Sequence, residues 1–142
     1  MFSFRIILSW IVSSIVMYLA FYLWHGFYLN ELSTLDYPKS LFYFFSALTY
    51  LGISFLIIRL YDFKLFKKYI PNLFTRGLAS GIVVGILVFL ISHVTGVGIG
   101  KSVTFQHLIL DATWQCTEQC VGGILVALGN FFIFDPSTEE NT

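Results

Sequence analysis

The sequence predicts an all-α integral membrane protein, a four-helix bundle with its N- and C-termini in the cytoplasm. Apolar residues make up 57% of the chain and charged residues 11%, whereas about a quarter of the residues in a typical soluble domain are charged. A soluble fold of 142 residues cannot cover so much apolar surface, but lipid solvates the outside of a membrane bundle. We therefore expect a single transmembrane domain over residues 1–134.

Four apolar segments follow one another along the chain, and a helix needs roughly 20 residues to cross a bilayer. We expect helices over about residues 6–26, 40–60, 77–97 and 104–132. The first three carry no full charge over nearly the required length. The fourth contains Asp111 and Glu118, each costing about 2.5–3.5 kcal/mol near the bilayer centre. It crosses the bilayer if these residues lie off-centre or face the bundle interior, and a re-entrant or interfacial helix is the alternative.

The basic residues predict the orientation. Most of them flank or fill the second connection, namely Arg59, Lys64, Lys67, Lys68 and Arg76. The first connection offers Lys39 and the third Lys101. Basic residues favour the cytoplasmic side, so we place the second connection and the N-terminus there. An even number of crossings then returns the acidic, polar tail at 135–142 to the cytoplasm, where we expect it to be disordered.

Apolar and basic residues alternate over 62–68 in this second connection. The segment is either a short amphipathic helix on the anionic inner leaflet or an ordinary basic loop. The net charge of the whole chain is zero, and nothing resembles a basic soluble face, so nucleic-acid binding is excluded. The sequence contains no nucleophile–base arrangement and no phosphate or dinucleotide loop, so it does not favour an enzyme and implies no cofactor.

Small residues recur at helical spacing in the last two helices. Gly77, Gly81 and Gly85 lie four apart on one face of the third helix. Cys116, Cys120 and Gly123 form a similar face on the fourth. Such faces let membrane helices approach closely, and a buried free cysteine behaves as a small apolar residue. We expect these faces to pack the bundle, although a homodimer contact remains an alternative.

Polar residues at membrane depth mark the candidate site. On the fourth helix, spacings of four, four and three place His107, Asp111, Gln115 and Glu118 on one stripe. With the expected topology, the three histidines and Asp111 lie toward the outer side. The predicted outward-facing pocket is lined by His25, His107 and Asp111, with Gln115 and Glu118 at its floor, Tyr18 and Tyr22 as walls, and His93 if its face turns inward.

Three interpretations of this cluster stay open. The polar residues fix helix packing through hydrogen bonds, or a buried carboxyl group binds a proton or a cationic or polar ligand, or His25, His107 and Asp111 hold a metal ion. We expect a small binding, transport or accessory protein of the membrane. A membrane-embedded metal-dependent enzyme and a structural subunit of a larger complex are the alternatives. Four helices leave little room for transport by a monomer, so we expect a homodimer or a larger complex.

Two segments resemble a known group of proteins. One is Leu23–Tyr28 at the end of the first helix, and the other is Asp111–Gly123 in the last. They are similar to small bacterial four-helix membrane proteins that are known as domains of unknown function. In that group an aromatic stretch closes the first helix and an acidic residue precedes a glycine-rich fourth helix. The resemblance implies the four-helix fold and a bacterial inner (cytoplasmic) membrane, and it implies no mechanism.

Overall fold

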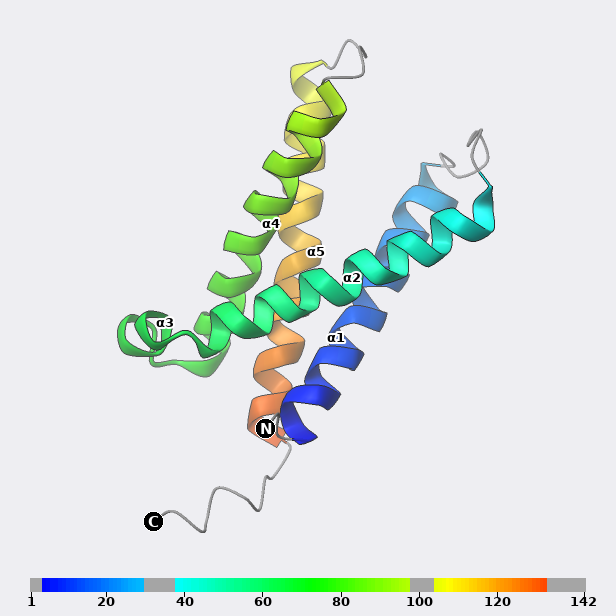
Figure 1. The fold of residues 1–142 in the computed structure, drawn as a ribbon. Coiled ribbons are helices and arrows are strands. Elements are labelled where there is room, and N and C mark those ends of the chain that lie inside the picture. Colours follow the sequence, from blue (N-terminus) through cyan, green and yellow to red (C-terminus); the bar gives the residue numbers. More distant parts are fainter. Residues whose placement is uncertain (1–3, 30–37, 98–103, 133–142) are drawn as a thin grey trace, which may run out of the picture.

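The computed structural model describes residues 4–29, 38–97 and 104–132 (Figure 1). The regular structure in these ranges is helical, so the all-α prediction is confirmed for them. The predicted tail at 135–142 and Lys101 lie outside the described residues. The elements in chain order are α1 (Phe4–Phe21), the π-helix η1 (Tyr22–Tyr28), α2 (Lys39–Asp62), α3 (Lys64–Tyr69), α4 (Leu73–Val97) and α5 (Phe105–Phe132).

Three helices within the described ranges are long and apolar enough to cross a membrane: Phe4–Tyr28, Lys39–Asp62 and Leu73–Val94. These correspond to the first three predicted crossings. Helix α5 is not among them, although its 28 residues span about 42 Å at 1.5 Å per residue. Its length is sufficient for a crossing, and its polar residues are what set it apart from the other three.

Helix α4 begins at Leu73, earlier than the start near residue 77 that the apolar pattern predicts. The cause is a side-chain cap. Asn72 Oδ1 accepts hydrogen bonds from the backbone N–H groups of Phe74 and Thr75, both at 3.0 Å, and such caps satisfy the free donors of a first helical turn. The early start brings Arg76 into the first turn of the helix, where the sequence interpretation had placed it in a connection.

Helix α5 runs antiparallel to both α1 and α4, while α2 crosses the bundle at a large tilt (Figure 1). The start of α1 and the end of α5 lie together, with Ser9 against Gly129. Toward the other end, the α1–α2 pair and the α4–α5 pair diverge into two arms. The molecule is therefore closely packed at one end and splayed at the other.

The α4–α5 interface is packed backbone against backbone. A Cβ atom added at Gly81 would lie 2.7 Å from the Cα of Cys120, and one added at Gly85 would lie 2.8 Å from the Cα of Cys116. A Cβ atom at Gly77 would collide with the carbonyl oxygen of Gly123. These are the small residues that the sequence singled out for packing, and glycine is what permits their close approach.

Serines join α1 to its neighbours. Ser13 is buried and donates to the carbonyl oxygen of Gly122 on α5 at 3.1 Å. Between α1 and α2, Ser54 donates to the carbonyl oxygen of Trp10 at 3.0 Å, and Trp10 Nε1 donates to that of Leu51 at 2.8 Å. Interhelical hydrogen bonds of this kind stabilise bundles that have no hydrophobic effect between their helices. Helix α5 thus has small residues toward both α4 and α1, and the second set was not expected.

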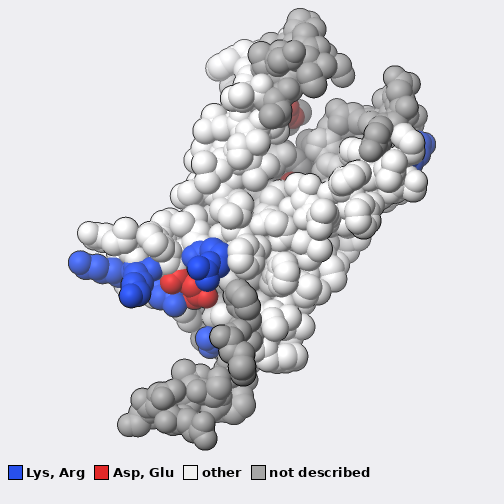
Figure 2. Space-filling model, viewed as in Figure 1, with Lys and Arg blue, Asp and Glu red and all other residues white. Residues whose placement is uncertain are grey.

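Lysine and arginine side chains gather at the closely packed end of the molecule, around α3 (Figure 2). The basic segment 62–68 is helical for most of its length, and Lys67 Nζ lies 2.9 Å from an oxygen of Asp62. The start of α1 lies at this same end. The basic residues of the second connection and the beginning of the chain's first helix therefore lie at the same end of the molecule.

Candidate functional site

The polar stripe of α5 divides into an exposed half and a buried half. His107 is exposed, and its Nδ1 lies 2.8 Å from Thr104 Oγ1, in the turn just before α5. Asp111 is also exposed, Gln115 is half-buried, and Glu118 is 2% exposed. The reason is the divergence of the two arms, because α1 and α2 cover α5 only toward the closely packed end (Figure 1).

The other two histidines each lie against an aromatic ring of their own segment. The ring centroids of His25 and Phe21 are 4.9 Å apart, and those of His93 and Phe89 are 5.7 Å apart. Within the described ranges, no group of three His, Cys, Asp or Glu side chains could hold a metal ion. The described structure therefore does not bring His25, His107 and Asp111 together as a set of three ligands.

The two tyrosines predicted as walls have different positions. Tyr18 packs between α1 and α2, with its ring centroid 6.0 Å from that of Tyr50, and its hydroxyl donates to the carbonyl oxygen of Tyr43 at 3.5 Å. Tyr22 is exposed and lies edge-on to the ring of Tyr43, 6.0 Å between centroids. Tyr18 thus contributes to the wall of the interior, and Tyr22 lies on the outside of the α1–α2 arm.

The middle of α5 carries a cluster of buried polar groups, which we name the polar centre: Trp114, Gln115, Glu118 and Gln119. Glu118 is 2% exposed and Gln119 is 0% exposed. Six of the centre's buried atoms have no hydrogen-bond partner among the described residues: Trp114 Nε1, Gln115 Oε1, both carboxyl oxygens of Glu118, and the amide oxygen and nitrogen of Gln119. Buried polar groups are normally paired, so this concentration requires an explanation.

Tyr50 is a polar residue of α2 that approaches the polar centre of α5 from this neighbouring helix. Its hydroxyl faces the carboxyl group of Glu118, but outside hydrogen-bond geometry. The sequence interpretation missed both Tyr50 and Gln119. Tyr50 stands in an apolar segment with no charge near it, and Gln119 lies off the stripe of spacing four. The signal that was available is the Glu118-Gln119 pair itself, two polar residues in succession at membrane depth.

A groove of about 320 Å³ leads to the polar centre between α2 and the α4–α5 pair. Its lining is aromatic and aliphatic apart from the polar side chains of Ser46, Thr49, Tyr50 and Gln115. Gln115 belongs to the polar centre, and Tyr50 faces it. Small-molecule sites commonly combine an apolar lining with a few convergent polar groups. The groove is lined by Phe21, Phe42, Phe45, Ser46, Thr49, Tyr50, Ile53, Val88 and Gln115.

A pair of stacked tryptophans closes the polar centre on the α1 side. Trp24 of η1 and Trp114 of α5 are parallel within 9°, with centroids 4.2 Å apart. Tyr28 stacks on Trp24 at 4.8 Å. The wide turn of the π-helix, closed by the N–H of Leu29 on the carbonyl oxygen of Trp24 at 2.8 Å, presents these rings to α5. π-Helical turns are rare and often occur at functional sites.

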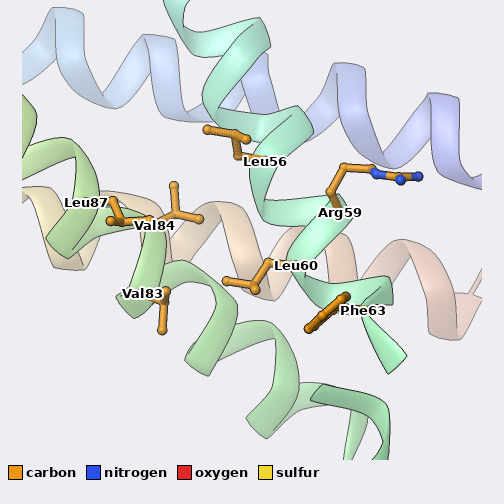
Figure 3. A pocket seen from close by; sticks show the side chains of 7 residues that line it. All are labelled: Leu56, Arg59, Leu60, Phe63, Val83, Val84 and Leu87. Carbon is orange, nitrogen blue, oxygen red and sulfur yellow. The ribbon is translucent and has the colours of Figure 1, made fainter. Parts of the chain in front are cut away.

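A second groove between α2 and α4, also about 320 Å³, has a different character (Figure 3). Apart from Arg59, the residues that line it are apolar, and Figure 3 shows the Arg59 side chain directed away from Val84 and Leu87. This groove therefore offers shape without convergent polar groups, unlike the groove that leads to the polar centre. Its lining residues are Leu56, Arg59, Leu60, Phe63, Val83, Val84 and Leu87.

Comparisons with protein-family models, with curated proteins and with solved structures find no match for this chain. The resemblance of two segments to small bacterial four-helix membrane proteins therefore stays a prediction from the sequence. The case for a function rests on the geometry and chemistry of the polar centre.

Proposed function

We propose that all four long helices cross the bilayer of a bacterial cytoplasmic membrane, with both termini in the cytoplasm. Helix α5 is long enough to cross, and Glu118 faces the other helices instead of lipid. The start of α1 and the end of α5 lie at the basic end of the molecule (Figures 1 and 2), as an even number of crossings and the positive-inside rule require.

Within this bundle the chain acts as a binding protein whose site is the polar centre and the groove that leads to it. The observation that carries this proposal is Glu118, a buried carboxyl group that the Tyr50 hydroxyl faces but does not satisfy by hydrogen-bond geometry, and that has no cation beside it in the described ranges. Burying an ionised carboxylate without a partner costs several kcal/mol. Such a group is stabilised in one of two ways, by a proton or by a cationic ligand.

The ligand we propose has an apolar body and a cationic group. Aromatic side chains of the groove suit an apolar or aromatic body, and the carboxylate of Glu118 suits the positive charge. Because a proton and the cation occupy the same carboxylate, binding of one releases the other. This exchange is the elementary step of proton-coupled transport. A chain of this size would need a second copy of itself to carry out such transport.

Tetraphenylphosphonium is a suitable probe, because its charge does not change with pH. We expect it to bind the purified full chain in detergent and to quench the fluorescence of Trp114. Its affinity should rise as the pH is raised, since fewer protons then compete for Glu118. The Glu118→Gln variant should lose about tenfold in affinity, which corresponds to about 1.4 kcal/mol, because it removes the Coulombic attraction between a buried carboxylate and the cation.

Asp111→Asn is the matched control. It removes an exposed carboxylate from the same stripe of the same helix, and we expect its affinity for the probe to stay within twofold of the wild type. A wild type that does not bind the cation, or a Glu118→Gln variant that binds it as well as the wild type does, would contradict the proposal and favour a purely structural role.

A further inference from the structure

A second unusual site lies at the basic end of the molecule, remote from the polar centre. Arg76, in the first turn of α4, is only 7% exposed. Its guanidinium carbon lies 4.3 Å from the centroid of the Tyr61 ring at the end of α2. Tyr61 itself is 1% exposed. An arginine and a tyrosine from two helices are thus buried against each other.

One hydrogen-bonding atom of each residue in this pair is left without a partner. Arg76 Nε and the Tyr61 hydroxyl are both buried without a partner in the part of the chain that the structure describes. The nearby ion pair there joins Lys67 to Asp62 and does not include Arg76. Arginine is almost never this buried unless it is paired, and the ring face of Tyr61 satisfies the charge but none of the guanidinium N–H donors.

The surroundings favour an anion at this position. A cation in the first turn of a helix opposes the helix dipole, whereas an anion there is stabilised by it. Arg5, in the first turn of α1 at the same end of the molecule, also has a buried Nε without a partner among the described residues. The basic side chains around α3 gather at this end on the face that Figure 2 shows. Positive charge and unused donors therefore coincide.

We propose that Arg76 and Tyr61 form a binding site for a phosphate group. The planar guanidinium matches phosphate oxygens in geometry and forms strong charge-assisted hydrogen bonds with them, and the Tyr61 hydroxyl supplies a further donor. The phosphate belongs either to a phospholipid headgroup of the adjacent leaflet or to a soluble phosphate ester. This site does not depend on the function proposed for Glu118.

The test measures the thermal unfolding midpoint of the full chain with two probes. One probe is inorganic phosphate added in detergent at constant ionic strength, and the other is phosphatidylglycerol compared with phosphatidylcholine in nanodiscs. We expect at least one of them to raise the midpoint of the wild type. Stabilisation by inorganic phosphate points to a soluble ester, and stabilisation by phosphatidylglycerol alone points to a lipid headgroup.

Variants decide whether the effect belongs to this site. Arg76→Gln should abolish the stabilisation, while Arg59→Gln, which removes an exposed arginine from the same end, should retain it. If Arg76→Gln does not fold, Tyr61→Phe keeps the ring beneath the guanidinium and should weaken binding several-fold. The proposal is overturned if neither probe stabilises the wild type, if Arg59→Gln loses the effect as fully as Arg76→Gln, or if Tyr61→Phe and the wild type respond equally.

Discussion

The two sides of the middle of α5 contribute to stability in opposite ways. On the side toward α4, Gly81 and Gly85 approach the backbone of α5 so closely that a methyl group has no room. On the side toward α2, Glu118 is buried with both carboxyl oxygens unpartnered in the described structure. Close packing on the first side stabilises the protein, whereas the unpartnered carboxyl group on the second side destabilises it. The unpartnered carboxyl group is therefore what distinguishes the second side, and the binding function proposed above depends on it.

Gly81→Ala should destabilise the protein the most, because the new methyl group has no room on the side of α4 that faces α5. The new Cβ atom would lie 2.7 Å from the Cα of Cys120, and the helices must separate to admit it. Overpacking of this kind typically costs about 1–3 kcal/mol, which thermal unfolding in detergent will detect.

Gly52→Ala is the control for this substitution. Gly52 is an exposed residue of α2 whose added Cβ atom would meet nothing within 4 Å. Since alanine is a better helix former than glycine by about 1 kcal/mol, we expect no loss of stability. Equal losses for the two variants would show that the α4–α5 contact is not especially tight.

Glu118→Leu should act in the opposite direction on the other side of α5. Leucine fills a similar volume and removes two carboxyl oxygens that have no partner in the described structure, and a buried polar group left without a hydrogen bond costs about 1–3 kcal/mol. We expect a higher unfolding midpoint together with loss of tetraphenylphosphonium binding. A variant that unfolds as readily as Gly81→Ala would instead identify Glu118 as a packing residue.

Breaking the stack of Trp24 on Trp114 should have the smallest effect on stability of the three changes. It tests how the polar centre is closed on the α1 side. Aromatic pairs contribute about 0.5–1.5 kcal/mol beyond their buried area. A double-mutant cycle of Trp24→Leu and Trp114→Leu, read by thermal unfolding, should give a coupling of this size. Additive single effects would mean that the stack does not join the two arms.

Local spacing was sufficient to predict the packed side of α5. Gly77, Gly81 and Gly85 must share a face of any straight helix, and the small residues that meet them follow the same rule. The stripe of Asp111 and Glu118 obeys that rule too, yet one of these residues is exposed and the other buried. Their difference arises from the divergence of the two arms, which depends on contacts far apart in the sequence.

The same reasoning explains what the sequence interpretation missed. Tyr50 reaches Glu118 because α2 crosses the bundle at a tilt (Figure 1), and no periodicity within α2 encodes that tilt. The π-helical turn that presents Trp24 to Trp114 likewise departs from the regular spacing on which helix prediction depends. Within the described ranges, His25, His107 and Asp111 are not brought together as three metal ligands, while Gln115 and Glu118 of the predicted pocket belong to the polar centre.

The most direct test of the central claim is the release of protons when the cation binds. Tetraphenylphosphonium is added to the weakly buffered protein, and the released protons are followed with a pH indicator. Binding should displace a proton from Glu118. The Asp111→Asn variant should then release as many protons as the wild type, and Glu118→Gln should release none. Cation binding without proton release, or equal release from Glu118→Gln, would contradict this claim.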